Sequence, residues 1–203
     1  MTIRKGSAYG EPGVALAPDG VVCRSDADAR AAVEAARRDG VPFPAIGLLG
    51  GDLCRTLAGP GDEGRLRSPE AVTFTVDVGE VLADGRLHLF VAHLVAHTRS
   101  WRRVVVAMNA QWRGPWNLGP RAHPNDGLLD TYDAHLAWSD LPKVRARLHH
   151  GAHLPHPGIK ERRTRAIQID LERPMPVWLD GERTLTARSL SLRCRPDALR
   201  VTV

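Results

Sequence analysis

The chain contains few cysteines and no long apolar stretch. Its three cysteines, Cys23, Cys54 and Cys194, form no CxxC pair, and their odd number argues against a disulfide framework. The same spacing argues against a cysteine-bound zinc ion. No run of about eighteen apolar residues occurs, which excludes a transmembrane helix, and the first residues lack the apolar core of a secretory signal. We therefore expect a cytoplasmic protein.

Lysine and aromatic residues are also scarce. Arginine outnumbers lysine 25 to 3, the formal net charge is +5, and aromatic residues make up 5% of the chain. An arginine-rich surface favours contact with anionic lipid or nucleic acid, although genomic codon bias produces the same composition. No recognisable nucleic-acid-binding module accompanies the arginines, so we expect no nucleic-acid partner. Trp112 and Trp116 flank Arg113 in a loop, a pattern that suits a lipid interface and equally suits core packing.

Glycine and proline, by contrast, are plentiful, with 19 and 15 residues, and they favour strands joined by tight turns. Residues 1–60 nevertheless follow a strand–helix–strand–helix order, which is typical of a small piece of α/β sheet. Ser25 or Asp26 caps the first helix and Gly40 ends it. The expected strands are 21–23 and 45–49, and the expected helices are 27–38 and 53–57.

Residues 60–70 form a polar link, after which apolar residues recur with period two. The link marks the predicted domain boundary. The strands expected beyond it are 72–76, 81–83, 87–96, 101–109, 130–138, 165–171, 177–179, 184–193 and 199–203, with one helix at about 139–149. We therefore predict an α+β protein, in which a small abbreviated α/β lobe at 1–60 precedes an antiparallel β-sandwich at 71–203.

Two acidic turns stand out in the second half of the chain. They are Asn125-Asp126-Gly127-Leu128-Leu129-Asp130 and Trp178-Leu179-Asp180-Gly181-Glu182, and a terminal Arg195-Pro196-Asp197-Ala198-Leu199-Arg200-Val201 follows. Asp-Gly is first of all a hairpin signal, because the pair tolerates positive φ angles. The order of these segments, however, resembles the C-terminal domain of the bacterial diacylglycerol kinase and YegS-like lipid kinase family over roughly residues 71–203.

This resemblance implies roles for both turns. Glu182 would be the base that takes the proton of a lipid hydroxyl, and Asp180 would orient it or help to bind metal; the alternative is a solvated turn. The Asp126 carboxylate and the Leu128 carbonyl would hold a structural Mg²⁺, the alternative being a hairpin without metal.

The resemblance extends weakly into the first sixty residues. The segment from Gly51 and Asp52 to Leu57 is similar to a family segment that contacts nucleotide, with Gly51 where the family has asparagine. The family's glycine-rich GGDGT turn falls on residues 24–28, where Asp26 lies among residues that are not glycine. Glycines let backbone N–H groups approach phosphates closely, so the lobe is abbreviated in function as well as in length. Gly51, Asp52 and Asp26 are the expected ATP-binding residues; Asp52 as a helix N-cap is the alternative.

The resemblance thus implies transfer of the γ-phosphoryl group of ATP, with Mg²⁺, to a hydroxyl of a diacylglycerol-like lipid at the membrane surface. The alternative is a catalytically degenerate homologue that binds lipid or a partner protein. A histidine-based metal hydrolase is a third reading, suggested by His153 in the histidine-rich stretch 149–156, although the spacing there suits no tight metal site. A homodimer is left open.

Overall fold

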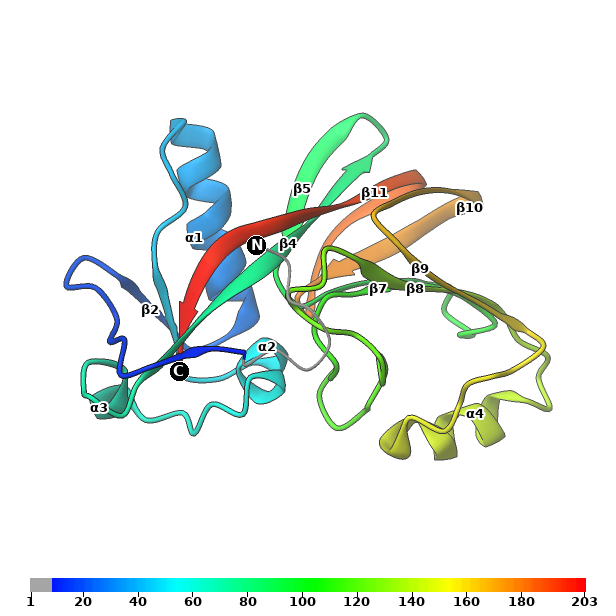
Figure 1. The fold of residues 1–203 in the computed structure, drawn as a ribbon. Helices are drawn as coiled ribbons and strands as arrows, with labels where there is room; N and C mark the ends of the chain where they lie inside the picture. The colour runs from blue at the N-terminus through cyan, green and yellow to red at the C-terminus, as the bar shows by residue number, and fades with distance from the viewer. Residues whose placement is uncertain (1–8) are drawn as a thin grey trace.

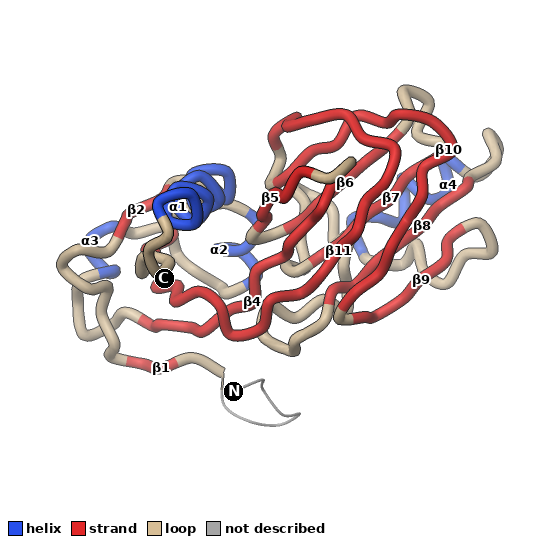
Figure 2. The backbone as a smooth tube through the Cα atoms, turned by 90° about the horizontal axis from the view of Figure 1, so that it is seen from above, coloured by secondary structure: helices blue, strands red, loops and turns tan. Residues whose placement is uncertain are grey.

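The computed structural model describes residues 9–203, and that part of the chain is mostly antiparallel β-sheet with few helices. The N-terminal elements are β1 (Glu11–Pro12), β2 (Val21–Cys23), α1 (Asp26–Asp39), β3 (Ile46–Leu48), α2 (Asp52–Thr56) and α3 (Glu63–Leu66). They are followed by β4 (Val72–Ala83), β5 (Arg86–Phe90), β6 (His93–His97), β7 (Arg103–Met108), β8 (Leu129–His135), α4 (Leu141–Arg147), the 3₁₀ turn Leu148–His150, β9 (Ile159–Thr164), β10 (Ala166–Leu179) and β11 (Glu182–Thr202). In Figure 1, α1 and α4 lie at opposite ends of the molecule with the strands between them, and Figure 2 shows the same from above.

Helix α1 forms where its end signals predict it. The hydroxyl of Ser25 accepts a hydrogen bond from the N–H of Asp28, and Gly40 ends the helix with a φ of 67°. Ala29 and Val33, one turn apart, are fully buried and belong to the same apolar cluster as residues of β3. This packing holds the N-terminus of α1, and Asp26 with it, against the sheet.

One long strand joins the two halves of the chain. Strand β11 pairs antiparallel with β4 and β10, and its last residues, Val201 and Thr202, pair parallel with Ile46 and Gly47 of β3. Strand β3 in turn pairs parallel with β2. The N-terminal strands therefore extend the same sheet rather than forming one of their own, and α3 falls within the polar link at 60–70. The lobe at 1–60 and the boundary before residue 71 stay predictions.

The observed strands differ from the expected ones where prolines and charges obscure the pattern. Strand β10 continues through the proline-containing stretch at 174–176: Pro174 lies within a register shift between Asp170 and Met175, and Pro176 pairs with Thr186. Strand β11 continues in the same way past a shift between Arg195 and Leu199. Strand β9 has the charged sequence IKERRT and was not expected; it lies at the end of the strand order, paired only with β8. The single strand expected at 87–96 is two strands, β5 and β6.

Three apolar clusters form the core of the described residues. One packs α1 and α2 against β3 and the first half of β4. A second fills the space enclosed by β4, β5, β6, β7, β10 and β11. A third lies between α4 and the faces of β7 and β8. None of the helices formed by residues 9–203 combines the length and apolar character needed to span a bilayer.

Candidate functional site

The β10–β11 hairpin turn carries Asp180 into the protein interior. Asp180 and Gly181 have φ angles of 51° and 86°, as a two-residue type I′ turn between Leu179 and Glu182 requires. The Asp180 carboxylate accepts hydrogen bonds from the backbone N–H groups of residues 91, 92 and 93, at 3.0, 2.8 and 3.1 Å. Burial raises its pKa above the ordinary value, and these N–H groups oppose the rise. Asp180 therefore fixes the break between β5 and β6.

Arg30 of α1 links this turn to the N-terminal helix. Its Nη2 atom lies 2.7 Å from Oε2 of Glu182, and its Nε atom lies 3.8 Å from Oδ2 of Asp180. The Arg30 side chain is 9% exposed, whereas that of Glu182 is 65% exposed. A pair with one exposed partner contributes only about 0–1 kcal/mol to stability. Its main consequence is geometric, because it fixes where the Glu182 carboxylate lies.

Asp26 and Gly51 fit together at the start of α2. The buried Asp26 carboxylate accepts hydrogen bonds from the N–H groups of Asp52 and Leu53, at 2.5 and 3.1 Å. Gly51 has a φ of 96°, and a Cβ added to it would lie 2.4 Å from Oδ1 of Asp26. Glycine is thus required at 51 for this close approach. Burial, and next the charge of Asp180, raise the pKa of Asp26 to about 7, and the two N–H groups oppose the rise.

His93 of β6 joins Asp52 to the same cluster. Its Nε2 atom lies 2.9 Å from Oδ2 of Asp52, whose Oδ1 accepts a hydrogen bond of 2.7 Å from the N–H of Gly114. Burial alone would raise the pKa of Asp52, but the His93 and Gly114 contacts hold it below the ordinary value. One ligand atom from each of Asp26, Asp52 and His93 lies within 4.8 Å of the others. Two carboxylates and an imidazole at this spacing form a donor set that fits a divalent cation.

The fold therefore brings together four of the predicted site carboxylates and two residues that the sequence did not mark. Asp26 and Asp52 come from separate segments, Asp180 and Glu182 come from the same turn, and Arg30 and His93 connect them. We call these six residues the acidic cluster. His93 was missed because nothing in its local sequence distinguishes it from other histidines. Only the pairing of β6 with β10 places it beside Asp180.

Asp126 and Leu128 lie apart from this cluster. Among residues 9–203, no hydrogen bond or ion pair connects them to it. Oδ1 of Asp126 accepts the N–H of Leu128 at 3.0 Å, and Oδ2 pairs with Nη2 of Arg163. Nε of Arg163 lies 2.9 Å from the buried Asp130, whose pKa burial raises to about 6, while Arg163 opposes the rise. A guanidinium thus lies where the resemblance implies Mg²⁺, so a cation at Asp126 would fit only if Arg163 moved away.

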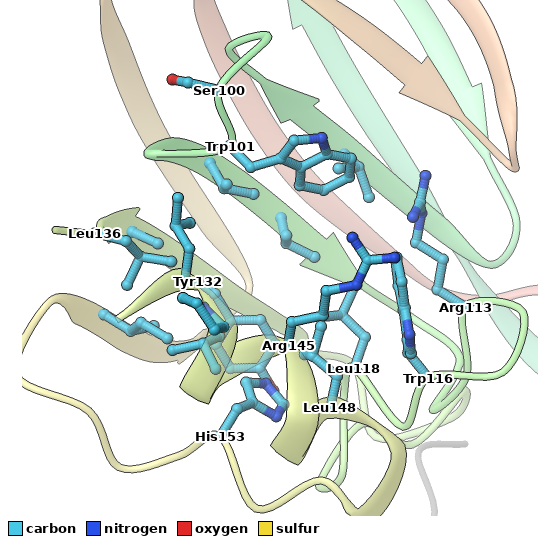
Figure 3. Close-up of a pocket in the computed structure, with 18 residues that line it drawn as sticks. Ser100, Trp101, Arg113, Trp116, Leu118, Tyr132, Leu136, Arg145, Leu148 and His153 are labelled. Carbon is cyan, nitrogen blue, oxygen red and sulfur yellow. The ribbon is translucent and has the colours of Figure 1, made fainter. Parts of the chain in front are cut away.

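An apolar pocket that the sequence did not predict lies between α4 and the faces of β7 and β8, with a volume of about 620 Å³ (Figure 3). Its walls are mostly aliphatic, and burial lowers the pKa of His153, which lies among them. In this view Trp101, Arg113, Trp116 and Arg145 gather toward one side, and Tyr132 and His153 toward the other. The remaining lining residues are Val95, Ser100, Val104, Val106, Leu118, Ala134, Leu136, Leu141, Pro142, Val144, Leu148 and Ile159.

One loop, residues 111–119, contacts both the acidic cluster and this pocket. The Gly114 N–H donates to Asp52, and Nη1 of Arg55 donates to the Gly114 carbonyl at 2.7 Å. The Arg55 guanidinium lies 3.6 Å from the centre of the Trp112 ring, while Arg113 and Trp116 line the pocket. The sequence suggested a lipid interface or core packing for the aromatic–arginine pattern of this loop, and the structure places Arg113 and Trp116 at the wall of a pocket.

The histidine-rich stretch does not form a metal site in the described part of the chain. His149 and His150 are exposed, and His153 is buried against the Tyr132 ring. Within residues 9–203, the group of side chains able to hold a metal is Asp26, Asp52 and His93. The hydrolase reading therefore lacks its ligands.

Comparison with known proteins identifies the family of the β-sheet domain. Residues 67–203 match the model of the family described as YegS C-terminal NAD kinase beta sandwich-like domain. The match covers more than half of the chain, which therefore belongs to this YegS-like lipid kinase family. No curated protein matched the chain.

Solved structures agree at the level of the fold. Two solved structures from Bacillus anthracis str. Sterne, one described as a putative diacylglycerol kinase and the other as a diacylglycerol kinase, superpose with TM-scores of 0.61 and 0.55. Each covers 78% of this chain and is 14% identical to it, and the chain covers 69% and 66% of their lengths. At this identity the likeness shows a shared fold.

Proposed function

We propose that this protein is a lipid kinase that transfers the γ-phosphoryl group of ATP to a hydroxyl of a diacylglycerol-like lipid. One observation carries the proposal: the loop at 111–119 contacts Asp52 of the acidic cluster through Gly114 and lines the apolar pocket through Arg113 and Trp116. A lipid in the pocket would thus have its polar end beside the carboxylates. Membership of the family supports the same reading.

Asp26 and Asp52 would hold the divalent cation that phosphoryl transfer uses. The cation would neutralise charge on the phosphates when bound. The N–H groups at the start of α2 already bond to Asp26, so they do not offer a free cradle for phosphate. Charge neutralisation by a cation is therefore more important here than in a site with a glycine-rich phosphate loop. The first sixty residues would then be an abbreviated nucleotide-binding lobe.

Glu182 would accept the proton of the lipid hydroxyl. Its carboxylate is exposed enough to reach a substrate, and Arg30 holds it at 2.7 Å. Asp180 would act indirectly, because its oxygens are already used by three backbone N–H groups and it lies 3.8 Å from Nε of Arg30. In this scheme Glu182 is the catalytic base, and Arg30 and Asp180 are positioning residues.

The direct test is incubation with labelled ATP, Mg²⁺ and vesicles that contain diacylglycerol and monoacylglycerol. Phosphorylated lipid is expected from the natural chain and from Glu172→Gln, which changes an exposed glutamate of β10, but not from Glu182→Gln. If the folded protein gives no product and does not bind ATP at millimolar concentration, the kinase proposal fails.

A second candidate is a homologue that binds lipid without phosphoryl transfer. The specific observation in its favour is that Asp26 occupies the α2 N–H groups while residues 24–28 contain no glycine. Calorimetry separates the two candidates, because only the kinase requires ATP binding. Co-sedimentation with vesicles tests the lipid-binding part alone. The membrane surface as the place of action, and a homodimer, stay predictions.

A further inference from the structure

Two arginines line the pocket, and the carboxylate of Asp52 acts electrostatically on one of them, Arg113. Within residues 9–203, neither Arg113 nor Arg145 forms an ion pair, and no aspartate or glutamate lines the pocket. The Nε atom of Arg113 is buried without a hydrogen-bond partner, and burial lowers the pKa of its guanidinium. A buried donor left unpaired destabilises the free protein, so this arrangement favours a ligand that supplies an acceptor.

The loop geometry aims Arg113 at this position. Arg113 and Trp116 exchange two backbone hydrogen bonds, at 2.9 and 3.1 Å, across Gly114, which has a φ of 54°. The tight turn places both side chains at the pocket. The Arg113 guanidinium lies 5.9 Å from the Trp101 ring and 5.7 Å from the Trp116 ring, within the range of a cation–π contact.

Trp101 is held over the same side of the pocket at an energetic cost. Its φ of 58° lies in the left-handed region, which is unfavourable for a bulky residue. The conformation persists because the indole stacks on His97 at 3.6 Å, and His97 stacks on Trp178 at 4.2 Å. Strain maintained by such packing gives the pocket a preformed aromatic wall near Arg113 and Arg145 (Figure 3).

The size of the pocket limits how much chain it can hold. Its volume of 620 Å³ lies within the roughly 300–1,000 Å³ typical of ligand sites. At about 30 Å³ for each methylene-sized group, the share that a water molecule takes in the liquid, this corresponds to roughly twenty groups. That corresponds to the size of one long acyl chain.

We propose that the pocket binds a single-chain amphiphile with an anionic head group, whose chain lies between α4 and the β7–β8 face and whose head contacts Arg113 and Arg145. The proposal deepens the proposed function and rests on it only for the lipid nature of the substrate. Within the class of diacylglycerol-like lipids, it narrows the occupant of the pocket to a single-chain lipid with an anionic head group.

Binding is measured without ATP, by calorimetry and by the fluorescence of Trp101 and Trp116. The probes are dodecanoate and monododecanoylglycerol, which share a chain length and differ in head charge, each below the concentration at which it forms micelles. Dodecanoate is expected to bind at least tenfold more tightly, because a charge-assisted hydrogen bond contributes about 1.5–3 kcal/mol. Vesicles of a two-chain anionic lipid form a third arm, and they are not expected to displace dodecanoate.

Two test variants change the pocket arginines, one on the loop at 111–119 and one on α4, and a control variant changes another arginine of α4. Arg113→Met and Arg145→Met keep the apolar stem and are each expected to reduce the preference for dodecanoate at least fivefold, in the order of magnitude of one lost charged contact. Arg147→Met, an exposed change on α4 outside the pocket, is expected to leave it unchanged. Ala134→Phe fills the pocket and is expected to abolish binding of both probes. Circular dichroism verifies that each variant is folded.

The proposal is overturned if the folded natural chain binds both probes equally or binds neither. It is also overturned if Arg113→Met and Arg145→Met both keep the full preference, or if two-chain vesicles compete with dodecanoate. These results are separable from a failure of the kinase proposal. A protein that prefers dodecanoate and transfers no phosphate refutes only the kinase, and one that phosphorylates diacylglycerol without preferring the anionic probe refutes only this inference.

Discussion

His93 and Asp52 are joined by a contact of 2.9 Å between Nε2 and Oδ2, although they lie 41 residues apart in the sequence. The backbone N–H of the same histidine donates to Asp180. His93 thereby links the acid at the start of α2 to the acid in the β10–β11 turn. The candidate site depends on this one residue of β6 more than on either acidic motif alone.

Stability should depend on pH through Asp26. Burial and the charge of Asp180 raise its pKa to about 7 from the ordinary value of 3.8, so between these limits the folded protein holds a proton that the unfolded chain releases. Stability contributed by this group is therefore lost as pH rises through that window, at about 1.4 kcal/mol per pH unit. Relative to the natural chain, Asp26→Asn should become steadily more stable from pH 5 to pH 7 in urea titrations. A constant difference across that range would contradict the assignment.

Asp180→Asn should destabilise the protein strongly. In asparagine one of the two carboxylate oxygens is replaced by an NH₂ group, which donates and does not accept. At least one of the three buried N–H groups therefore loses its acceptor, and each such loss costs about 1–3 kcal/mol. Asp84→Asn is the matched control, because Asp84 has a positive φ in the same kind of Asp-Gly turn and also accepts backbone N–H groups, but on an exposed hairpin. Urea unfolding should show a loss at least twice as large for Asp180. If both variants lose the same free energy of unfolding, burial of the Asp180 turn adds nothing to its contribution to stability.

Arg30→Met should show whether Arg30 orients Glu182 or contributes to substrate binding. If Arg30 only orients Glu182, kcat and kcat/KM of lipid phosphorylation should both fall by about tenfold, because the interaction acts in the transition state. The KM for ATP should not change. Arg37→Met, an exposed change on the same helix, serves as the control. A rise in KM with kcat preserved would argue against this role.

Arg163→Met should reveal whether Asp126 can bind Mg²⁺. The variant leaves Asp126 and the buried Asp130 without their shared cation, and a loss of about 2 kcal/mol is expected. Millimolar Mg²⁺ should restore part of the melting temperature in the variant and have little effect on the natural chain. If Mg²⁺ stabilises the natural chain as much as the variant, the Arg163 guanidinium does not occupy the position at which Asp126 would bind the metal.

Local sequence was sufficient for features that depend on neighbouring residues. The start and end of α1 follow from Ser25 and Gly40, and the Asp180-Gly181 turn from its dipeptide, because caps and tight turns are set by local backbone preferences. It was insufficient for β9, whose charged residues show no buried face, and for β10, where prolines coincide with a bulge. Edge position and register shifts are decided by partner strands.

The sequence by itself determined the mostly β character of the chain, the caps of α1, the acidic turns and the order of motifs that relates it to a lipid kinase family. These are properties of residue type and spacing. Only the tertiary structure decided that His93 joins Asp52 to Asp180, that Arg163 pairs with Asp126, and that α4 encloses an apolar pocket against β7 and β8. The physical reason is that ion pairs and cavities arise between side chains far apart in the chain, whose proximity depends on strand pairing and not on local preference.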